Sequence, residues 1–256
     1  MKRLKLLAFT SVTLFVLSGT SNANMDFLPP DDIVGISFWV ISMGLLSATV
    51  FFFIERGSVN PNWRTALTVA GIITGIAFVN YLYIRNVYVS QGEATILYRY
   101  IDWIITMPLQ MILFYLILSA VRKVPKSLFW KLLSGSVLMV LVAYLGVSKN
   151  IPSIVGFIIG LGAWIYLLYE IFSGEAGRAA ARSGNKPMVN AYGSMRMIVT
   201  VVWAIYPLGY VFGYITNSVD DNLLNIVYNI ADFINKIAFG LIIWAAAMQN
   251  TSQRSR

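Results

Sequence analysis

Long apolar stretches separated by short polar connections run along most of the chain. A helix of about 20 residues crosses the hydrocarbon core of a bilayer. Stretches of at least that length occur seven times, at residues 33–54, 65–84, 95–120, 128–147, 151–172, 197–216 and 223–248. The connections between them carry proline near the predicted helix ends, where proline is best tolerated. The pattern therefore predicts an all-α protein that folds as a bundle of seven transmembrane helices.

Composition supports a membrane protein and removes several kinds of chemistry. The 256 residues are 58% hydrophobic and only 12% charged, which is far outside the range of soluble proteins. Cysteine and histidine are both absent. Their absence excludes disulfides and thiolate metal sites, and it removes the commonest proton shuttle and metal ligand. We expect no metal site.

The N-terminus has the pattern of a secretory signal peptide. The first five residues carry three positive charges, a short apolar run follows at 6–17, and residues 21–23 resemble a cleavage site. We expect residues 1–23 to be removed and residues 24–256 to form one membrane domain with its N-terminus outside. The alternative is that the first apolar run is an eighth membrane helix.

The net charge of +8 is explained by membrane topology. Alternate connections and the C-terminal tail hold most of the Lys and Arg, whereas the opposite side has only Arg85 and Lys149. The residues on the basic side are Arg56, Arg64, Arg122, Lys123, Lys126, Lys131, Arg178, Arg182, Lys186, Arg196, Arg254 and Arg256. Because cytoplasmic loops are enriched in Lys and Arg, we expect this side and the C-terminus in the cytoplasm of a multi-pass protein of the bacterial inner membrane. Anionic lipid headgroups would bind as a secondary consequence, and nucleic acid is not an expected partner.

Apart from the helix ends, four charged residues lie inside the predicted helices. The third helix contains Arg99 and Asp102, and the seventh contains Asp232 and Lys236. A charge at the bilayer centre costs at least about 2.5–3.5 kcal/mol on insertion scales, so such residues need partners or a function. Two positive and two negative charges cancel, as a buried cluster requires. They are either structural ion pairs or the surroundings of an amine whose chemistry needs a dry pocket, above all a Schiff base with an aldehyde.

Aromatic residues on four predicted helices bear on that choice. They are Trp103, Trp164, Trp203, Tyr206 and Tyr228. Such residues usually form part of a core, but here they could enclose a flat, apolar, conjugated ligand beside the amine. A protonated Schiff base would then need an anionic counterion, for which Asp102 and Asp232 are the candidates.

Three stretches of these helices resemble the microbial rhodopsins, and the proteorhodopsins in particular. They are Arg-Tyr-Ile-Asp-Trp at 99–103 with Thr106 and Pro108, Trp-Ala-Ile-Tyr-Pro at 203–207, and Asp-Phe-Ile-Asn-Lys at 232–236. The resemblance implies all-trans retinal bound covalently to Lys236 as a protonated Schiff base. It makes Asp102 the primary counterion and proton acceptor, with Thr106 one turn away, and Asp232 the second counterion. Arg99 would hold the extracellular side of the cluster.

The resemblance also implies which residues surround the retinal. They are Trp103, Gln110, Met139, Trp164, Trp203, Tyr206 and Pro207. Gln110 falls at the position where such proteins tune their colour. A glutamine there implies a blue-absorbing pigment, because a polar group near the Schiff base stabilises the ground-state charge distribution.

Two positions depart from the family pattern. Leu113 stands eleven residues after the acceptor, where proton-pumping proteorhodopsins have a carboxylic acid, and leucine cannot hold a proton. We therefore expect slow reprotonation and a slow late photocycle. Asn80 stands where the family usually has a histidine paired with the acceptor. An amide can hydrogen-bond Asp102 but cannot share a titratable proton with it.

The leading hypothesis is light-driven outward translocation of protons by a retinal protein that is not an enzyme. Its partners would be the lipid bilayer, protons and, as in the family, further copies of the same chain. The alternatives are an inward pump, a slow-cycling light sensor that signals through a separate transducer, and a transporter or receptor without a covalent cofactor. Glu55, Glu170 and Glu175 are expected to be solvated helix ends, with a substitute proton relay as the alternative for each.

Overall fold

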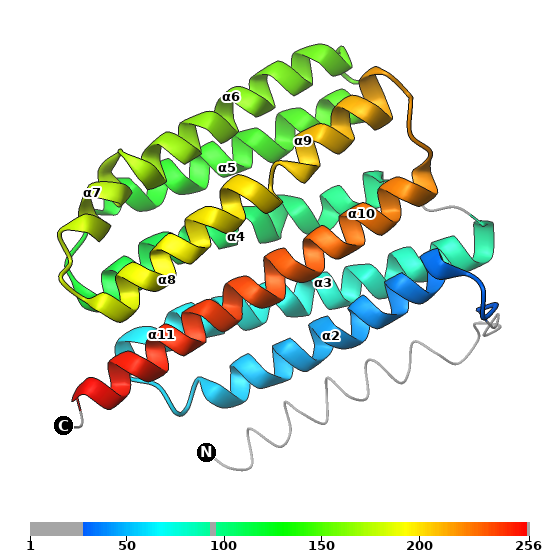
Figure 1. Ribbon diagram of the computed structural model, residues 1–256. Helices are drawn as coiled ribbons and strands as arrows, with labels where there is room; N and C mark the ends of the chain where they lie inside the picture. The colour runs from blue at the N-terminus through cyan, green and yellow to red at the C-terminus, as the bar shows by residue number, and fades with distance from the viewer. Residues whose placement is uncertain (1–27, 93–95, 255–256) are drawn as a thin grey trace.

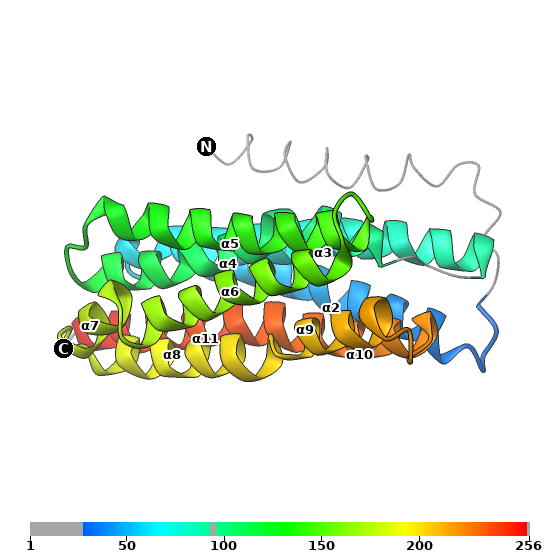
Figure 2. The same ribbon diagram turned by 90° about the horizontal axis from the view of Figure 1, so that it is seen from above.

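The helical spans lie side by side in one elongated bundle (Figure 1). The structure is a computed structural model that describes residues 28–92 and 96–254. Within those residues, seven helical segments are long and apolar enough to cross a membrane, which confirms the predicted fold class. The expected signal peptide at 1–23 lies outside the described residues. Viewed from above, α3, α4 and α5 form one layer, and the helices from α8 to α11 form the other (Figure 2).

The first five spans are single helices, and the last two are interrupted. The single helices are α2 (Ile33–Glu55), α3 (Arg64–Gln91), α4 (Leu97–Val121), α5 (Lys126–Val147) and α6 (Ser153–Phe172), followed by the short α7 (Glu175–Ala181). The sixth span comprises α8 (Lys186–Met197), a π-helical turn (Ile198–Val202), α9 (Ile205–Tyr210) and a second π-helical turn (Val211–Ile215). The seventh comprises α10 (Asp221–Phe233), a π-helical turn (Ile234–Ala238) and α11 (Phe239–Arg254).

Polar caps explain where several of these helices begin. The Asp32 side chain accepts a hydrogen bond from the backbone N–H of Gly35 at 2.9 Å at the start of α2. Asn185 and Asp220 cap α8 and α10 in the same way. Such caps satisfy backbone donors that the first helical turn leaves without a partner.

The sixth span begins earlier than the apolar pattern predicts. We expected it from residue 197, but α8 already begins at Lys186, after the Asn185 cap and with Pro187 in its first turn. Apolar runs report only the part of a helix that lies in hydrocarbon. A polar extension such as residues 186–196 therefore leaves no signal in the hydrophobic pattern.

The surface and interior of the bundle are distributed as a lipid solvent requires. Large apolar side chains are exposed along its outside, among them Val40, Val79 and Ile158, which are about 60% exposed. The interior contains charged and amide side chains as well as apolar ones. In lipid, polar groups must find partners inside the protein, so this interior is where a site would be built.

The basic connections and the C-terminal helix end meet at one end of the bundle (Figure 1). The backbone N–H of Asn60, between α2 and α3, donates to the hydroxyl of Thr251 near the end of α11 at 2.8 Å. Arg122, after α4, donates to the carbonyl of Ala179 in α7 at 3.0 Å. We refer to this end as the basic end.

Candidate functional site: a buried lysine between two carboxylates

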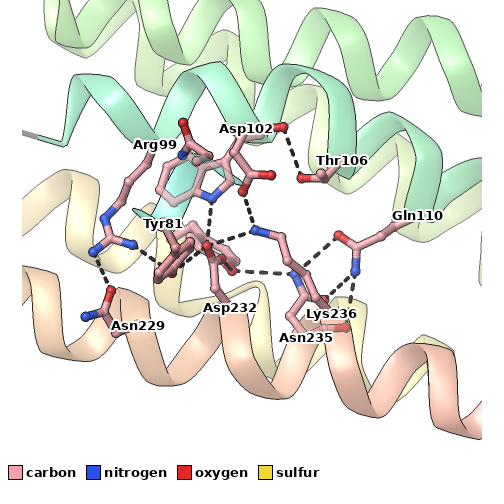
Figure 3. A network of polar contacts seen from close by, with 12 residues as sticks. Tyr81, Arg99, Asp102, Thr106, Gln110, Asn229, Asp232, Asn235 and Lys236 are labelled. Atoms are coloured by element: carbon pink, nitrogen blue, oxygen red, sulfur yellow. Dashed lines mark hydrogen bonds and ion pairs between the residues drawn. The ribbon is translucent and has the colours of Figure 1, made fainter. Parts of the chain in front are cut away.

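Lys236 lies at the centre of the bundle with two carboxylates beside its amine (Figure 3). Its Nζ forms an ion pair with Asp102 Oδ2 from α4 and another, at 2.9 Å, with Asp232 Oδ2 from α10. The three side chains are each about 1% exposed. The structure thus brings together the charged residues that the sequence placed on two different helices.

The segment that carries Lys236 is a π-helical turn. Residues Ile234–Ala238 adopt this conformation between α10 and α11. A π-helical turn inserts an extra residue into a helix and is frequent at functional sites. Asp232 precedes this turn and Asn235 lies within it, so one short segment supplies the amine, a carboxylate and an amide.

Asp232 is held by neutral donors in addition to Lys236. Tyr81 from α3 donates to its Oδ2 at 2.8 Å, and Trp103 from α4 donates to the same oxygen at 3.3 Å. Tyr206 from α9 donates to Oδ1 at 2.5 Å. A buried carboxylate is tolerated when such bonds replace its lost hydration. Both oxygens of Asp232 are therefore occupied, and the side chain is fixed from three helices.

Asp102 is less fully engaged than Asp232. Its Oδ2 contacts Lys236, but its Oδ1 accepts no hydrogen bond from the residues that the structure describes. Thr106, one turn further along α4, donates to the backbone carbonyl of Asp102 at 3.1 Å. A proton could bind at Oδ1 without displacing a protein donor. Of the two acids beside the lysine, Asp102 is thus the one arranged to accept a proton.

Arg99 lies on the far side of the cluster from Lys236 (Figure 3). Its guanidinium donates to Tyr81 at 2.9 Å, to Asn229 Oδ1 at 2.6 Å and to Asn225 Oδ1 at 2.9 Å. Tyr81 in turn bonds Asp232, so this tyrosine connects the guanidinium to the carboxylate. Among the described residues, Arg99 forms no direct ion pair with either aspartate of the cluster.

A second polar branch leads from the lysine segment to Gln110. The Gln110 amide donates to Asn235 Oδ1 at 2.9 Å, and the indole of Trp203 donates to the same oxygen at 2.9 Å. The Asn235 amide reaches the hydroxyl of Tyr206 at 3.5 Å. Asn235 therefore joins Gln110 and Trp203 to the tyrosine that bonds Asp232.

An aromatic cavity lies next to this cluster. Six of the residues predicted to surround a ligand line it, namely Trp103, Met139, Trp164, Trp203, Tyr206 and Pro207. Gln110 and Lys236 are not among its lining residues. Trp103 and Tyr206 contact both the cavity and Asp232, so the cavity ends against the ion cluster. An apolar ligand in the cavity would lie against the residues that hold the counterion.

The sequence did not single out Tyr81, Asn225 or Asn235, although all three are fully buried. Tyr81 bonds Asp232, Asn225 bonds Arg99, and Asn235 bonds Gln110. Asn225 and Asn235 are amides within an apolar run, and a buried amide needs a partner. That signal was available in the sequence. Tyr81 gave none, because a tyrosine in a membrane helix is common at an interface or in a core.

The two positions that depart from the family pattern are both buried. The Leu113 side chain, on α4, is 1% exposed and belongs to the hydrophobic core of the bundle. The Asn80 amide donates to the backbone carbonyl of Tyr98 at 3.3 Å rather than to Asp102. The Asp102 hydrogen bond considered for this amide is therefore not formed.

The three glutamates at helix ends differ in their surroundings. Glu170 is only 3% exposed and accepts hydrogen bonds from the backbone N–H groups of Glu175 and Ala176, so the expectation of a solvated end is wrong for it. Glu175 forms an ion pair with Lys131 at 2.8 Å. Glu55 accepts a hydrogen bond from the indole of Trp244 at 2.9 Å.

Comparison with known proteins agrees with this arrangement. The sequence model of the family described as bacteriorhodopsin-like proteins matches residues 32–250. The chain is 49% identical over 223 residues to the blue-light absorbing proteorhodopsin of Gamma-proteobacterium Hot 75m4, covering 86% of this chain and 88% of that one. It is 46% identical over 226 residues to the green-light absorbing proteorhodopsin of Gamma-proteobacterium EBAC31A08, covering 88% and 90%.

A solved structure gives the same result. The crystal structure of a blue light-absorbing proteorhodopsin from Med12 superimposes with a TM-score of 0.74 at 47% identity, covering 86% of this chain and all of that one. The spans, the charged cluster and these relatives lead to one conclusion. This chain belongs to the bacteriorhodopsin-like family and is a microbial rhodopsin of a bacterial membrane that it crosses several times.

Proposed function

We propose that this protein is a light-driven proton pump of the proteorhodopsin type that moves protons outward through a slow photocycle. The observation that carries the proposal is the buried Lys236 amine, paired with Asp102 and Asp232 beside an aromatic cavity. Two relatives with nearly half of their residues identical are proteorhodopsins by name.

The residues fit retinal as the cofactor. Members of this family bind retinal through a Schiff base to a lysine. Bound in this way to Lys236, all-trans retinal would supply light absorption and a light-dependent change at the lysine nitrogen. The cavity beside the cluster is apolar and walled by Trp103, Trp164 and Trp203, which suits a flat polyene. The two carboxylates provide the negative charge that a cation on Lys236 Nζ requires.

The side chains of this protein then have separate tasks. Asp102 accepts a proton at a carboxylate oxygen, because its Oδ2 contacts Lys236 Nζ and its Oδ1 accepts no hydrogen bond from any described residue. Asp232 keeps its charge and position, because donors occupy both of its oxygens. Arg99 lies nearer the end of the bundle opposite the basic end, where Asn225 and Asn229 hold its guanidinium.

The two halves of the bundle differ in polarity, and this difference supports the direction and speed that we propose. From Asp232 a chain of polar contacts runs through Tyr81 and Arg99 to Asn229 and Ser37. Toward the basic end, α4 places Leu113 in the core with Phe114 beside it. We place the basic end in the cytoplasm, so a proton is released to the outside through the polar half, and a replacement proton enters slowly from the cytoplasm through the apolar half.

The proposal is tested by measuring proton flux in illuminated liposomes that contain the retinal-loaded protein. Outward-directed flux should appear in light, disappear with a protonophore and be lost in Asp102→Asn, which removes the acceptor charge. Asp31→Asn, a change of the same chemistry at an exposed residue before α2, should leave flux unchanged. An electrically silent wild-type protein would contradict the pump and favour a light sensor.

A further inference from the structure

A hollow at the basic end gathers positive charges from two segments. It lies between the connection from α4 to α5 and the short helix α7. Its lining residues are Arg122, Lys123, Val124, Pro125, Glu175, Arg178, Ala179 and Arg182. We propose that this hollow is a binding site for a phosphate-bearing anion at the membrane surface, either a lipid headgroup or free phosphate.

The helix that forms one wall of the hollow is firmly held. The buried carboxylate of Glu170 accepts hydrogen bonds from the backbone N–H of Glu175 at 2.7 Å and of Ala176 at 3.2 Å. A Cβ atom at Gly177 would lie 2.2 Å from the carbonyl oxygen of Phe172, so α7 approaches the end of α6 as closely as a glycine permits. The backbone that carries Arg178, and Arg182 just after α7, is therefore fixed in position. The Arg178 guanidinium itself donates to the carbonyl of Ser173 at 2.8 Å.

The connection between α4 and α5 forms the opposite wall of the hollow, and one of its cations is hydrogen-bonded to α7. Arg122 follows the last residue of α4 and donates to the carbonyl of Ala179 at 3.0 Å. This bond holds the start of the connection against α7. The hollow is thus enclosed by two segments whose spacing is set by a hydrogen bond.

The cations around the hollow lack protein counterions. Arg178 lies in α7 and Arg182 follows its last residue as the C-cap, four residues on, a spacing that is unfavourable for like charges. The lining also includes one acid, Glu175, but its carboxylate is paired with Lys131 at 2.8 Å. None of the ion pairs among the described residues includes one of the four cations of the lining, which are Arg122, Lys123, Arg178 and Arg182. An anion in the hollow would relieve this repulsion, and the planar guanidinium suits phosphate oxygens well.

The depth of the hollow suits a headgroup. Trp130 lies about one turn into α5, just past the hollow, and is 62% exposed. Exposed tryptophans are enriched at the level of the headgroups in membrane proteins. Basic pockets on the cytoplasmic side of membrane proteins are known to receive anionic headgroups, but free phosphate has the same recognition chemistry. The experiment must therefore separate the two sources.

The test measures the thermal unfolding midpoint of the full chain in nanodiscs at constant ionic strength. One set contains phosphatidylcholine alone, a second adds phosphatidylglycerol, and a third has phosphatidylcholine with inorganic phosphate in the buffer. A ligand that binds only the folded state raises the midpoint, by about 2–4 °C for each kcal/mol in a domain of this size. We expect such a rise with phosphatidylglycerol, with phosphate or with both.

The matched variants decide whether the hollow is responsible. Lys123→Gln with Arg182→Gln removes two charges from its lining and should abolish the rise. Lys126→Gln with Lys186→Gln removes two exposed charges from the same end outside the lining and should keep it. If the first double variant has a lowered midpoint before any anion is added, Arg182→Gln alone is compared with Lys186→Gln.

Each result then has one meaning. A rise with phosphatidylglycerol alone identifies the lipid headgroup, and a rise with phosphate identifies a soluble anion, provided that the lining variant loses it. No rise in either condition, or an equal loss in both double variants, would overturn the site. The measurement needs neither light nor retinal, so its failure would leave the proposed pump activity untouched.

Discussion

At the scale of single residues, the two aspartates beside Lys236 have different surroundings although both contact the amine. Asp232 receives hydrogen bonds from Tyr81, Trp103 and Tyr206, whereas Asp102 keeps one oxygen without a described donor. Two identical side chains can therefore serve as a fixed counterion and as a proton acceptor. Environment rather than residue type makes this distinction.

The lysine itself gives the first prediction. Lys236→Ala should yield a folded protein that remains colourless when retinal is added, because it removes the amine to which we propose that the cofactor is attached. Absorption spectra of the purified protein measure this, and Lys126→Ala, an exposed lysine at the basic end, serves as the control. A visible band in Lys236→Ala would contradict attachment at this residue and support a site without a covalent cofactor.

The amide pair gives the second prediction. Gln110→Leu should move the absorption maximum to longer wavelength, because the polar group that stabilises the ground-state charge distribution is lost. Asn235 fixes the Gln110 amide at 2.9 Å. The shift should therefore be smaller when Gln110→Leu is made in an Asn235→Ala background. Equal shifts in the two backgrounds would mean that the amides act independently.

At the scale of elements, α4 brings most of the polar chemistry to one side of a helix. Arg99, Asp102, Thr106, Gln110 and Leu113 follow one another at spacings of three or four residues, and all five are buried. That spacing keeps side chains on one face of an α-helix. The stripe is polar up to Gln110 and apolar from Leu113 on. The change in polarity therefore falls on the route between Lys236 and the basic end.

Restoring an acid to this stripe gives the third prediction. Leu113→Glu should speed the decay of the deprotonated state after a flash by about 10²-fold, the lower end of what a positioned general acid contributes. Tyr115→Glu places the same group on a partly buried part of α4 that faces away from the stripe, and it should not speed the decay. Flash photolysis measures both variants. A wild-type decay as fast as that of Leu113→Glu would show that another group already supplies the proton.

At the scale of the whole molecule, the charge of the basic end supports the orientation that we propose. The connections that carry most of the Lys and Arg meet there, together with the end of α11. A protease site added after Arg256 should be cut in inverted membrane vesicles and protected in intact spheroplasts. Cleavage in intact spheroplasts would reverse the topology and, with it, the proposed direction of transport.

The hydrophobic pattern predicted the spans well because burial in lipid imposes a long apolar run on every one of them. It could not predict that the sixth span begins at Lys186, since that part of the helix is polar. The charged residues of the site were predictable because a charge at membrane depth is costly and demands a partner. The contribution of Tyr81 was not predictable, since it depends on how α3 packs against α4 and α10.

The π-helical turn around Lys236 has a mechanical consequence for the rest of the bundle. From this turn α11 continues without interruption to Arg254, and a helix rises by about 1.5 Å per residue. Near the C-terminal end of α11, the Thr251 hydroxyl accepts a hydrogen bond from the backbone N–H of Asn60, and the Asn250 side chain accepts one from the indole of Trp63. Asn60 and Trp63 lie just before the start of α3. A rotation of the lysine segment would therefore be transmitted along α11 over roughly 20 Å. Events at the centre of the membrane can in this way reach the surface loop between α2 and α3.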